Sequence, residues 1–181
     1  MDVTLARSVG LSAVARGDAR VLILGTLPGE RSLESGKYYA NPRNRFWSII
    51  QELFGIPHDL LYEERLVRLQ ENRIAIWDVC RSAHRPGSLD SKLVAGEPND
   101  FNSLLSSHPH IELVCFNGGK AQKLYTRCVL PKLLRDFASI RYELLPSTSP
   151  AHAAMPYDEK LSCWRVILGS ALSSSLVPTT S

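Results

Sequence analysis

The apolar positions of the sequence form four short continuous runs, which predict buried strands. Each run stops at a glycine, a proline or a polar residue, as expected for strands of a parallel sheet that is covered on both faces. The clearest are VLILGT, which leads into a loop with glycine and proline, and IAIWDV, which carries an aspartate near its end. The predicted strands span residues 21–26, 74–79, 111–116 and 141–147.

Between these runs the apolar residues recur at intervals of three or four, which predicts amphipathic helices. In NRFWSIIQELF, for example, Phe46, Ile49 and Leu53 fall on one side of a helix. Asn44 and Asp100 stand where the N-caps of two such helices are expected. Helices are predicted over residues 44–54, 60–70, 101–107, 120–130 and 157–172.

This alternation of strands and helices predicts an α/β fold in which a mostly parallel sheet lies between two layers of helices. Ligands of such folds bind beyond the carboxyl ends of the strands. The loops with unusual chemistry all follow predicted strands. We therefore expect them to gather on one rim of the sheet.

Length and composition are those of one ordinary globular domain. The chain has 181 residues, of which 44% are hydrophobic and 22% charged, and this excludes wholesale disorder and fibrous repeats. No apolar run approaches the roughly 18 residues of a membrane span. We expect a single domain over residues 1–172 and a disordered tail, SSSLVPTTS, over residues 173–181. The net charge of +3 is compatible with a polyanionic partner without identifying one.

The four cysteines are scattered and form no CxxC pair, so a zinc ribbon or an iron–sulfur cluster is not expected. The first 20 residues contain no apolar core of a secretory leader. Free thiols in a reducing compartment are the simplest interpretation, which predicts a cytoplasmic protein, with a transit peptide as the alternative.

Two glycine-containing loops lack the spacing of nucleotide-binding motifs. GTLPGERS, at residues 25–32, follows the first strand but is not a dinucleotide fingerprint, because its glycines are wrongly spaced. FNGGKA, at residues 116–121, is not a phosphate loop, because Val114 and Ala121 replace two required residues. The amide of Asn117 in this loop is a candidate for the rim of the site.

The segment YYANPRNRFW, at residues 38–47, has the most unusual composition. It interleaves aromatic rings with cations and amides, the combination that an unstacked base and its flanking phosphates require. We expect Phe46 and Trp47 in the core and Tyr39 at the ligand. For Asn44 two roles stay open, a simple helix cap or an amide that contacts a ligand or orients a water molecule.

LPSTSPAHAAM, at residues 145–155, ends the fourth strand with three hydroxyl residues, a proline and a histidine. Hydroxyls and backbone N–H groups in such a turn can hold a phosphate without reading sequence. A hydrolase in which Ser149 pairs with His152 is the competing interpretation, although no G-x-S-x-G elbow accompanies these residues. Asp78, at the end of the second strand, is either a structural carboxylate or part of the site.

Taken together, these loops resemble those of the uracil-DNA glycosylase superfamily, and more narrowly its hypoxanthine-DNA (deoxyinosine) glycosylase branch. The similarity runs over about residues 20–170. GTLPGERS and STSPAHA stand where the superfamily has its two motifs, and YYANPRNRFW resembles a segment of the mismatch-specific uracil glycosylases. The resemblance implies a three-layer α/β/α fold with a four-stranded, mostly parallel sheet. It also implies a monomer that excises bases from DNA with neither metal nor organic cofactor.

Four positions depart from the pattern of the uracil-specific members. Leu27 replaces the acid or amide that directs the attacking water in many relatives, and Gly29 replaces a tyrosine that excludes large bases. In the second motif, Ser147 replaces a histidine that stabilises the leaving uracil anion, and Ala151 replaces the leucine wedge. Gly29 implies a roomier pocket that admits a purine, and Ala151 leaves the role of the wedge to another residue, with His152 and Met155 as the candidates.

The resemblance assigns roles to individual residues. Asn44 matches the catalytic side chain of the deoxyinosine branch, Tyr39 the aromatic residue that stacks on the extruded base, and Asp78 roughly the position of a base-reading asparagine. The expected base-binding residues are Gly25, Thr26, Leu27, Pro28, Gly29, Tyr39, Asp78 and Asn117. The expected DNA-binding residues are Arg43, Arg45, Ser147, Ser149, Pro150 and His152.

The sequence thus predicts a monofunctional DNA glycosylase of base excision repair that removes deaminated bases and leaves an abasic site. Hypoxanthine is the preferred base, with xanthine and uracil as further candidates. No lysine is placed convincingly for a Schiff base. The alternatives are a catalytically inactive nucleic-acid-binding relative, which Leu27 and Ser147 favour, and the Ser149/His152 hydrolase of small molecules.

Overall fold

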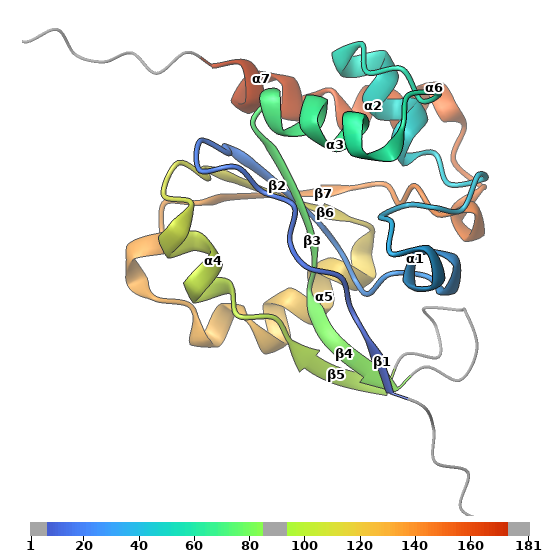
Figure 1. The fold of residues 1–181 in the computed structure, drawn as a ribbon. Coiled ribbons are helices and arrows are strands. Elements are labelled where there is room, and N and C mark those ends of the chain that lie inside the picture. The colour runs from blue at the N-terminus through green and yellow to red at the C-terminus, as the bar shows by residue number, and fades with distance from the viewer. Residues whose placement is uncertain (1–6, 85–93, 174–181) are drawn as a thin grey trace, which may run out of the picture.

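A computed structural model describes residues 7–84 and 94–173 of the protein (Figure 1). Its centre is a sheet of four parallel strands in the order β3-β2-β6-β7. These strands are β2 (Val21–Gly25), β3 (Ile74–Asp78), β6 (Leu113–Asn117) and β7 (Arg141–Leu145). Each ends within two residues of its predicted bounds, so the predicted α/β fold is confirmed.

Helices cover both faces of this sheet (Figure 1). One layer consists of α2 (Phe46–Phe54), α3 (Tyr62–Glu71), α6 (Tyr157–Trp164) and α7 (Val166–Leu172). The other consists of α4 (Phe101–Ser107) and α5 (Gly119–Cys128). Successive residues of a strand point to opposite faces, and accordingly Val21 and Ile23 pack in one core while Leu22 and Leu24 pack in the other. Within the described residues no helix has the length and apolarity to cross a membrane.

Two helical predictions differ from the structure in detail. The helix expected over residues 157–172 is divided at Arg165 into α6 and α7. A further helix, α1 (Glu30–Ser35), follows β2 and was not predicted. It has only six residues, too few for an apolar period to emerge, and Gly36 ends it in a left-handed conformation with φ 65°.

A second, antiparallel sheet was also not predicted. It has the order β1-β4-β5 and consists of β1 (Arg7–Val9), β4 (Cys80–His84) and β5 (Val94–Pro98). Its pairing is irregular, with register shifts on both sides of Ser82. Such irregularity removes the strict alternation of apolar and polar residues by which strands are found in a sequence. Short 3-10 turns complete the fold at Leu130–Lys132, Arg135–Phe137 and Pro150–His152.

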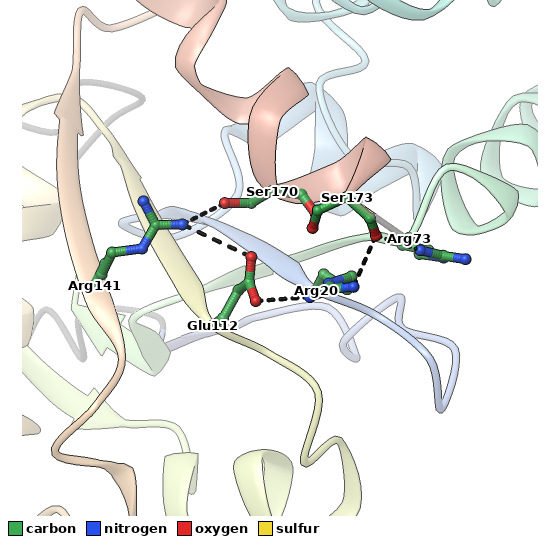
Figure 2. Close-up of polar contacts among 6 residues, drawn as sticks. All are labelled: Arg20, Arg73, Glu112, Arg141, Ser170 and Ser173. Atoms are coloured by element: carbon green, nitrogen blue, oxygen red, sulfur yellow. Dashed lines mark hydrogen bonds and ion pairs between the residues drawn. The ribbon is translucent and has the colours of Figure 1, made fainter. Parts of the chain in front are cut away.

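A polar network joins the amino ends of the four parallel strands to the end of α7 (Figure 2). Arg20 and Arg73, which precede β2 and β3, donate to the carbonyl oxygen of Ser173 over 2.8 and 2.9 Å. Glu112, which precedes β6, pairs with Arg20 at 2.8 Å and with Arg141 at 3.7 Å. The network therefore fastens the last helix to the edge of the sheet opposite the predicted ligand rim. Residues 174–181 of the predicted tail lie outside the described residues.

Candidate functional site

The loops at the carboxyl ends of β2, β3, β6 and β7 surround a cavity of about 680 Å³. This confirms that the chemically unusual loops gather on one rim. Of the predicted site residues, all but Arg45 line the cavity: Gly25, Thr26, Leu27, Pro28, Gly29, Tyr39, Arg43, Asn44, Asp78, Asn117, Ser147, Ser149, Pro150 and His152. The lining also includes residues that were not predicted, namely Glu30, Arg31, Ser32, Tyr38, Asn41, Thr148 and Ala151.

The floor of the cavity depends on a close approach between two neighbouring strands. Gly25 of β2 and Asp78 of β3 are register partners in the parallel ladder. A Cβ atom built on Gly25 would overlap the Oδ1 atom of Asp78, so any larger residue at this position would displace the carboxylate. Asp78 is 4% exposed, and the Asn99 side chain donates to its backbone carbonyl over 2.8 Å. The fold thus places a buried acidic group at the inner end of the cavity.

Tyr39 occupies a strained position at the side of the cavity. Its φ of 56° lies in the left-handed region that aromatic residues rarely adopt, and such strain is typical of functional sites. One face of its ring stacks on Phe46, with ring centroids 3.8 Å apart and an interplanar angle of 14°. Burial, reinforced by the charge of Asp78, raises the pKa of Tyr39, so its hydroxyl stays protonated at neutral pH.

The residues next to Tyr39 hold its loop in place. Tyr38 is buried; its N–H donates to the Tyr62 hydroxyl over 2.8 Å, and the Trp47 indole donates to the Tyr38 carbonyl over 3.3 Å. Phe46 and Trp47 are buried as well, which confirms the predicted core positions. Both adjacent tyrosines line the cavity, and Tyr38 is in addition a buried member of the core.

Asn44 lies at the mouth of the cavity, at the beginning of α2. Its Oδ1 atom accepts the N–H of Phe46 over 2.9 Å, and its own N–H donates to the Asn41 carbonyl over 2.9 Å. The N-cap of α2 is Arg45, so the predicted N-cap position of Asn44 is wrong by one residue. Asn44 instead closes the turn just before the helix, where its Oδ1 atom accepts the N–H of the first helical residue. An amide oxygen accepts two hydrogen bonds, so this contact fixes the orientation of Oδ1 and leaves its second lone pair for a ligand or a water molecule.

Asn117 connects the end of β6 to the second motif. Its Nδ2 atom donates to Thr148 Oγ1 over 2.9 Å, and its Oδ1 atom accepts the Thr148 N–H over 2.9 Å. Nδ2 also lies 3.4 Å from the Tyr39 hydroxyl. The N–H of Arg45 donates to the Thr148 carbonyl over 3.0 Å, which ties the start of α2 to the same loop. Thr148, missed by sequence reasoning although it lies between two predicted serines, is thus a central linker.

The second motif folds into a turn that is held by its own hydroxyls. Ser147 Oγ accepts the N–H of Ser149 over 3.2 Å, and Ser149 Oγ accepts the N–H of Ala151 over 3.3 Å. As acceptors, both hydroxyls retain their hydrogen for donation to an external anion. Within the described residues, no hydrogen bond joins Ser149 Oγ to the His152 ring, and His152 is exposed. This geometry does not support the Ser149/His152 hydrolase.

Lys160 of α6 binds the same turn through hydrogen bonds to its backbone. It is 4% exposed, and its ammonium donates to the carbonyls of Ser147 and His152 over 2.6 and 3.2 Å. Burial lowers the pKa of this ammonium, with a smaller effect from Arg45. The sequence carried a signal for it, because Lys160 shares the buried helical stripe of Trp164 and Ile167.

Two departures from the uracil-specific pattern have clear structural consequences. Leu27 is buried against one of the two cores, so no polar side chain projects from this position of the first motif. Gly29 lies at the cavity with nothing within 4 Å of an added Cβ atom, so the space beside it is open. Among the described residues, no cluster of three or more histidine, cysteine or acidic side chains could hold a metal ion.

Comparison with known proteins identifies the class. The family model of the uracil DNA glycosylase superfamily matches residues 12–168, nearly the whole chain. The protein therefore belongs to this superfamily, and the resemblance inferred from its sequence is confirmed.

Two curated relatives narrow the comparison. Both are named hypoxanthine DNA glycosylase. The one from Methanosarcina acetivorans is 39% identical over 144 residues, covering 79% of this chain and 87% of the relative. The one from Methanosarcina barkeri is 36% identical over 113 residues, covering 62% of this chain and 72% of the relative. A solution NMR structure from Methanosarcina acetivorans, provisionally described as a uracil DNA glycosylase, has a TM-score of 0.78 at 34% identity and covers 92% of this chain and 99% of that one.

Proposed function

We propose that this protein is a monofunctional DNA glycosylase that excises hypoxanthine from DNA and leaves an abasic site. The observation that carries the proposal is that Tyr39, the buried Asp78 and Asn44 line one cavity. Membership of the uracil DNA glycosylase superfamily and the two relatives named hypoxanthine DNA glycosylase support it.

Recognition begins with extrusion of the nucleotide, because the target base is out of reach inside the duplex. The extruded base stacks on the ring face of Tyr39 that Phe46 does not cover. The Asp78 carboxylate accepts the N1–H of hypoxanthine, whereas adenine presents a bare acceptor at that position. An unpaired acceptor facing a buried carboxylate costs about 1–3 kcal/mol, which gives a physical reason for rejecting the normal base.

Purine selectivity also needs space. The open volume beside Gly29 supplies it, and the cavity of about 680 Å³ lies within the range of sites for small organic ligands. Backbone groups of the 25–29 loop complete the contacts with the edge of the base. Xanthine and uracil fit the same contacts, so we include them as lesser substrates.

Asn44 is the catalytic residue in this proposal. Cleavage of the N-glycosidic bond passes through a cationic sugar, and a water molecule must meet that sugar on the face opposite the leaving base. The Asn44 Oδ1 atom, oriented by the Phe46 N–H, holds this water in place. An amide does not remove a proton at neutral pH, so we expect modest turnover.

The DNA backbone is held by residues that, apart from Arg45, also line the cavity: Arg43, Arg45, Ser147, Ser149, Pro150 and His152. Hydroxyl, guanidinium and backbone N–H groups contact phosphates without reading sequence. We propose that the protein acts in this way as a monomer on DNA of the cytoplasm. The arrangement needs neither a metal nor an organic cofactor.

The test is a set of oligonucleotides, single- and double-stranded, each with one hypoxanthine, xanthine or uracil. Incubation with the protein and then with alkali should cut the hypoxanthine oligonucleotide at the damaged site, faster than the others. Cleavage must require alkali, because the proposed product is an abasic site. If the oligonucleotides are bound but none is cut, the inactive nucleic-acid-binding alternative, suggested by Leu27 and Ser147, replaces the proposal.

A further inference from the structure

A second cavity, of about 530 Å³, adjoins the base cavity. The two share Arg43, Ser149 and Pro150 in their linings, so the turn of the second motif forms the wall between them. The far side of the second cavity is formed by the first turns of α6, including Tyr157 and Lys160. A DNA strand whose extruded base occupies the first cavity would therefore pass close to the second.

The charges around the second cavity are all of one sign. Among the described residues, those that line it with a charge are Arg43, Arg45 and Lys160, and no described carboxylate is part of the lining. The acidic residues whose charge affects Tyr157, Glu52 and Asp158, do not line the cavity. A hollow with three cations and no acid in its walls favours an anionic ligand.

Lys160 has a hydrogen-bonding capacity that the described part of the chain does not fill. An ammonium carries three donors, and the Lys160 ammonium makes two hydrogen bonds, to the carbonyls of Ser147 and His152. Because the side chain is 4% exposed, its third N–H has little access to bulk water. A buried charge with a spare donor beside a cavity is stabilised when an anion enters that cavity.

Arg45, like Lys160, has side-chain donors without a partner among the described residues. Its guanidinium lies 5.7 Å from the centroid of the Tyr157 ring, while its backbone N–H is bound to Thr148. Within residues 7–84 and 94–173 the guanidinium forms no hydrogen bond or ion pair. The aromatic ring thus holds the planar group at the cavity with its donors available, the arrangement that suits bidentate contact with a phosphate.

We propose that the second cavity binds one phosphate of the DNA strand that flanks the extruded nucleotide, through Lys160, Arg45 and the Ser149 hydroxyl. The site rests on the proposed function in that its ligand is the same DNA strand. It adds Lys160, from a helix outside the superfamily-like motifs, as a direct DNA contact. The same ammonium holds the turn that separates the phosphate from the base, so phosphate binding and the shape of the base cavity are coupled.

A scan of single neutral phosphates tests this site. Double-stranded oligonucleotides with one hypoxanthine carry a methylphosphonate at one position at a time, and their affinities are measured for the wild-type protein, Lys160→Met and Arg45→Met. Lys123→Met is the control, because Lys123 is an exposed lysine of α5 on the other face of the sheet. One methylphosphonate position next to the hypoxanthine should weaken wild-type binding at least about tenfold, the loss expected for one charge-assisted hydrogen bond.

The pairing of variant and position decides the outcome. In Lys160→Met and Arg45→Met that same methylphosphonate should have little further effect, whereas in Lys123→Met it should weaken binding as in the wild type. The slope of log affinity against log salt concentration should also fall by about one in Lys160→Met and Arg45→Met, and Lys160→Arg should restore it. Equal sensitivity of all variants to every methylphosphonate would overturn the proposal.

Two further readouts separate the possible failures. Thermal unfolding shows whether Lys160→Met folds. If it does not, the data for Arg45→Met and Lys160→Arg decide alone, because the first variant keeps Lys160 and the second keeps a positive charge at that position. Excision of hypoxanthine is measured on the same oligonucleotides. Excision without the variant-specific phosphate effect rejects the phosphate site and leaves the glycosylase. The phosphate effect without excision retains the site in a DNA-binding protein and rejects the glycosylase.

Discussion

Asn44 combines two roles that are usually considered alternatives. The hydrogen bond from the Phe46 N–H closes the turn before α2, and the same bond fixes Oδ1 beside the cavity. A side chain that is already fixed loses less entropy when it orients a water molecule. The turn is therefore part of the catalytic arrangement that we propose.

Replacing Asn44 separates the two roles. Asn44→Ala should reduce the rate of hypoxanthine excision at least about 10²-fold, the scale of losing one positioned catalytic group. The matched control is Asp100→Ala, which removes the N-cap of α4, where the Asp100 carboxylate accepts the Ser103 N–H over 3.0 Å. Each variant removes one side-chain acceptor of a backbone N–H in a helix's first turn and should lose about 1 kcal/mol of stability, but only Asn44→Ala should lose activity. Comparable excision rates for the two variants would remove Asn44 from the reaction.

The open space beside Gly29 gives a second test of a single residue. Gly29→Tyr should abolish excision of hypoxanthine, because the ring would occupy the volume that admits a purine, and should leave thermal stability nearly unchanged. Gly17→Tyr is the control, since an added Cβ atom there also meets nothing within 4 Å but Gly17 does not line the cavity. Hypoxanthine release by Gly29→Tyr at the wild-type rate would contradict the proposed pocket.

At this scale the sequence predicted which residues meet but not how they are held. Asn44, Tyr39 and Asp78 were identified by residue type and position, and the structure brings all three to one cavity. The left-handed backbone of Tyr39 has no signature in its residue type, and the close approach of Gly25 to Asp78 joins segments that are distant in the sequence. No local pattern encodes such contacts. The sequence analysis did not single out Lys160, because a lysine within a helical stripe has no local feature that shows whether it is buried.

At the level of elements, the continuous apolar runs were the reliable signal, because a strand buried on both faces needs no alternation. The antiparallel sheet and α1 escaped prediction because they are short and irregular.

The cavity depends on how the helices and strands around it are joined. Thr148 links β6 to α2, since its side chain and backbone contact Asn117 and its carbonyl accepts the Arg45 N–H.

Removing the Thr148 hydroxyl should loosen this link. Thr148→Val keeps the volume but leaves Asn117 Nδ2 without its acceptor at 2.9 Å, which should cost about 1–3 kcal/mol of stability. Because the same amide contacts the Tyr39 hydroxyl, excision of hypoxanthine should also fall. Thr126→Val, on the exposed face of α5, is the control and should change neither quantity. Urea unfolding and excision rates measure both, and an unchanged Thr148→Val would show that the link is dispensable.

For the whole molecule, the two edges of the parallel sheet have different tasks. The carboxyl edge carries the cavity, with a strained backbone and a buried carboxylate that both oppose stability. The amino edge carries the network of Arg20, Glu112 and Arg141, which fastens α7 to the strands (Figure 2). Stability supplied at one edge thus offsets the strain that binding requires at the other.

The contribution of Glu112 to this network should depend on pH in a defined direction. The hydrogen bond from Arg20 lowers the pKa of Glu112 below its ordinary value. The ionised carboxylate therefore stabilises the fold above about pH 4.3, the ordinary pKa of glutamate, and this stabilisation is lost as the pH falls through the lowered value. Glu112→Gln should cost about 1 kcal/mol at pH 7, a figure that allows for the partial exposure of the pair.

Urea unfolding of the wild type and Glu112→Gln between pH 7 and pH 3 measures this dependence. The difference between the two should shrink towards zero at the acidic end, because the wild-type side chain then becomes as neutral as glutamine. Glu71→Gln is the control, since the Arg68–Glu71 pair is exposed on both sides and should contribute little at any pH. A Glu112→Gln deficit that stays constant over the whole range would mean that shape and packing, rather than charge, hold α7 against the sheet.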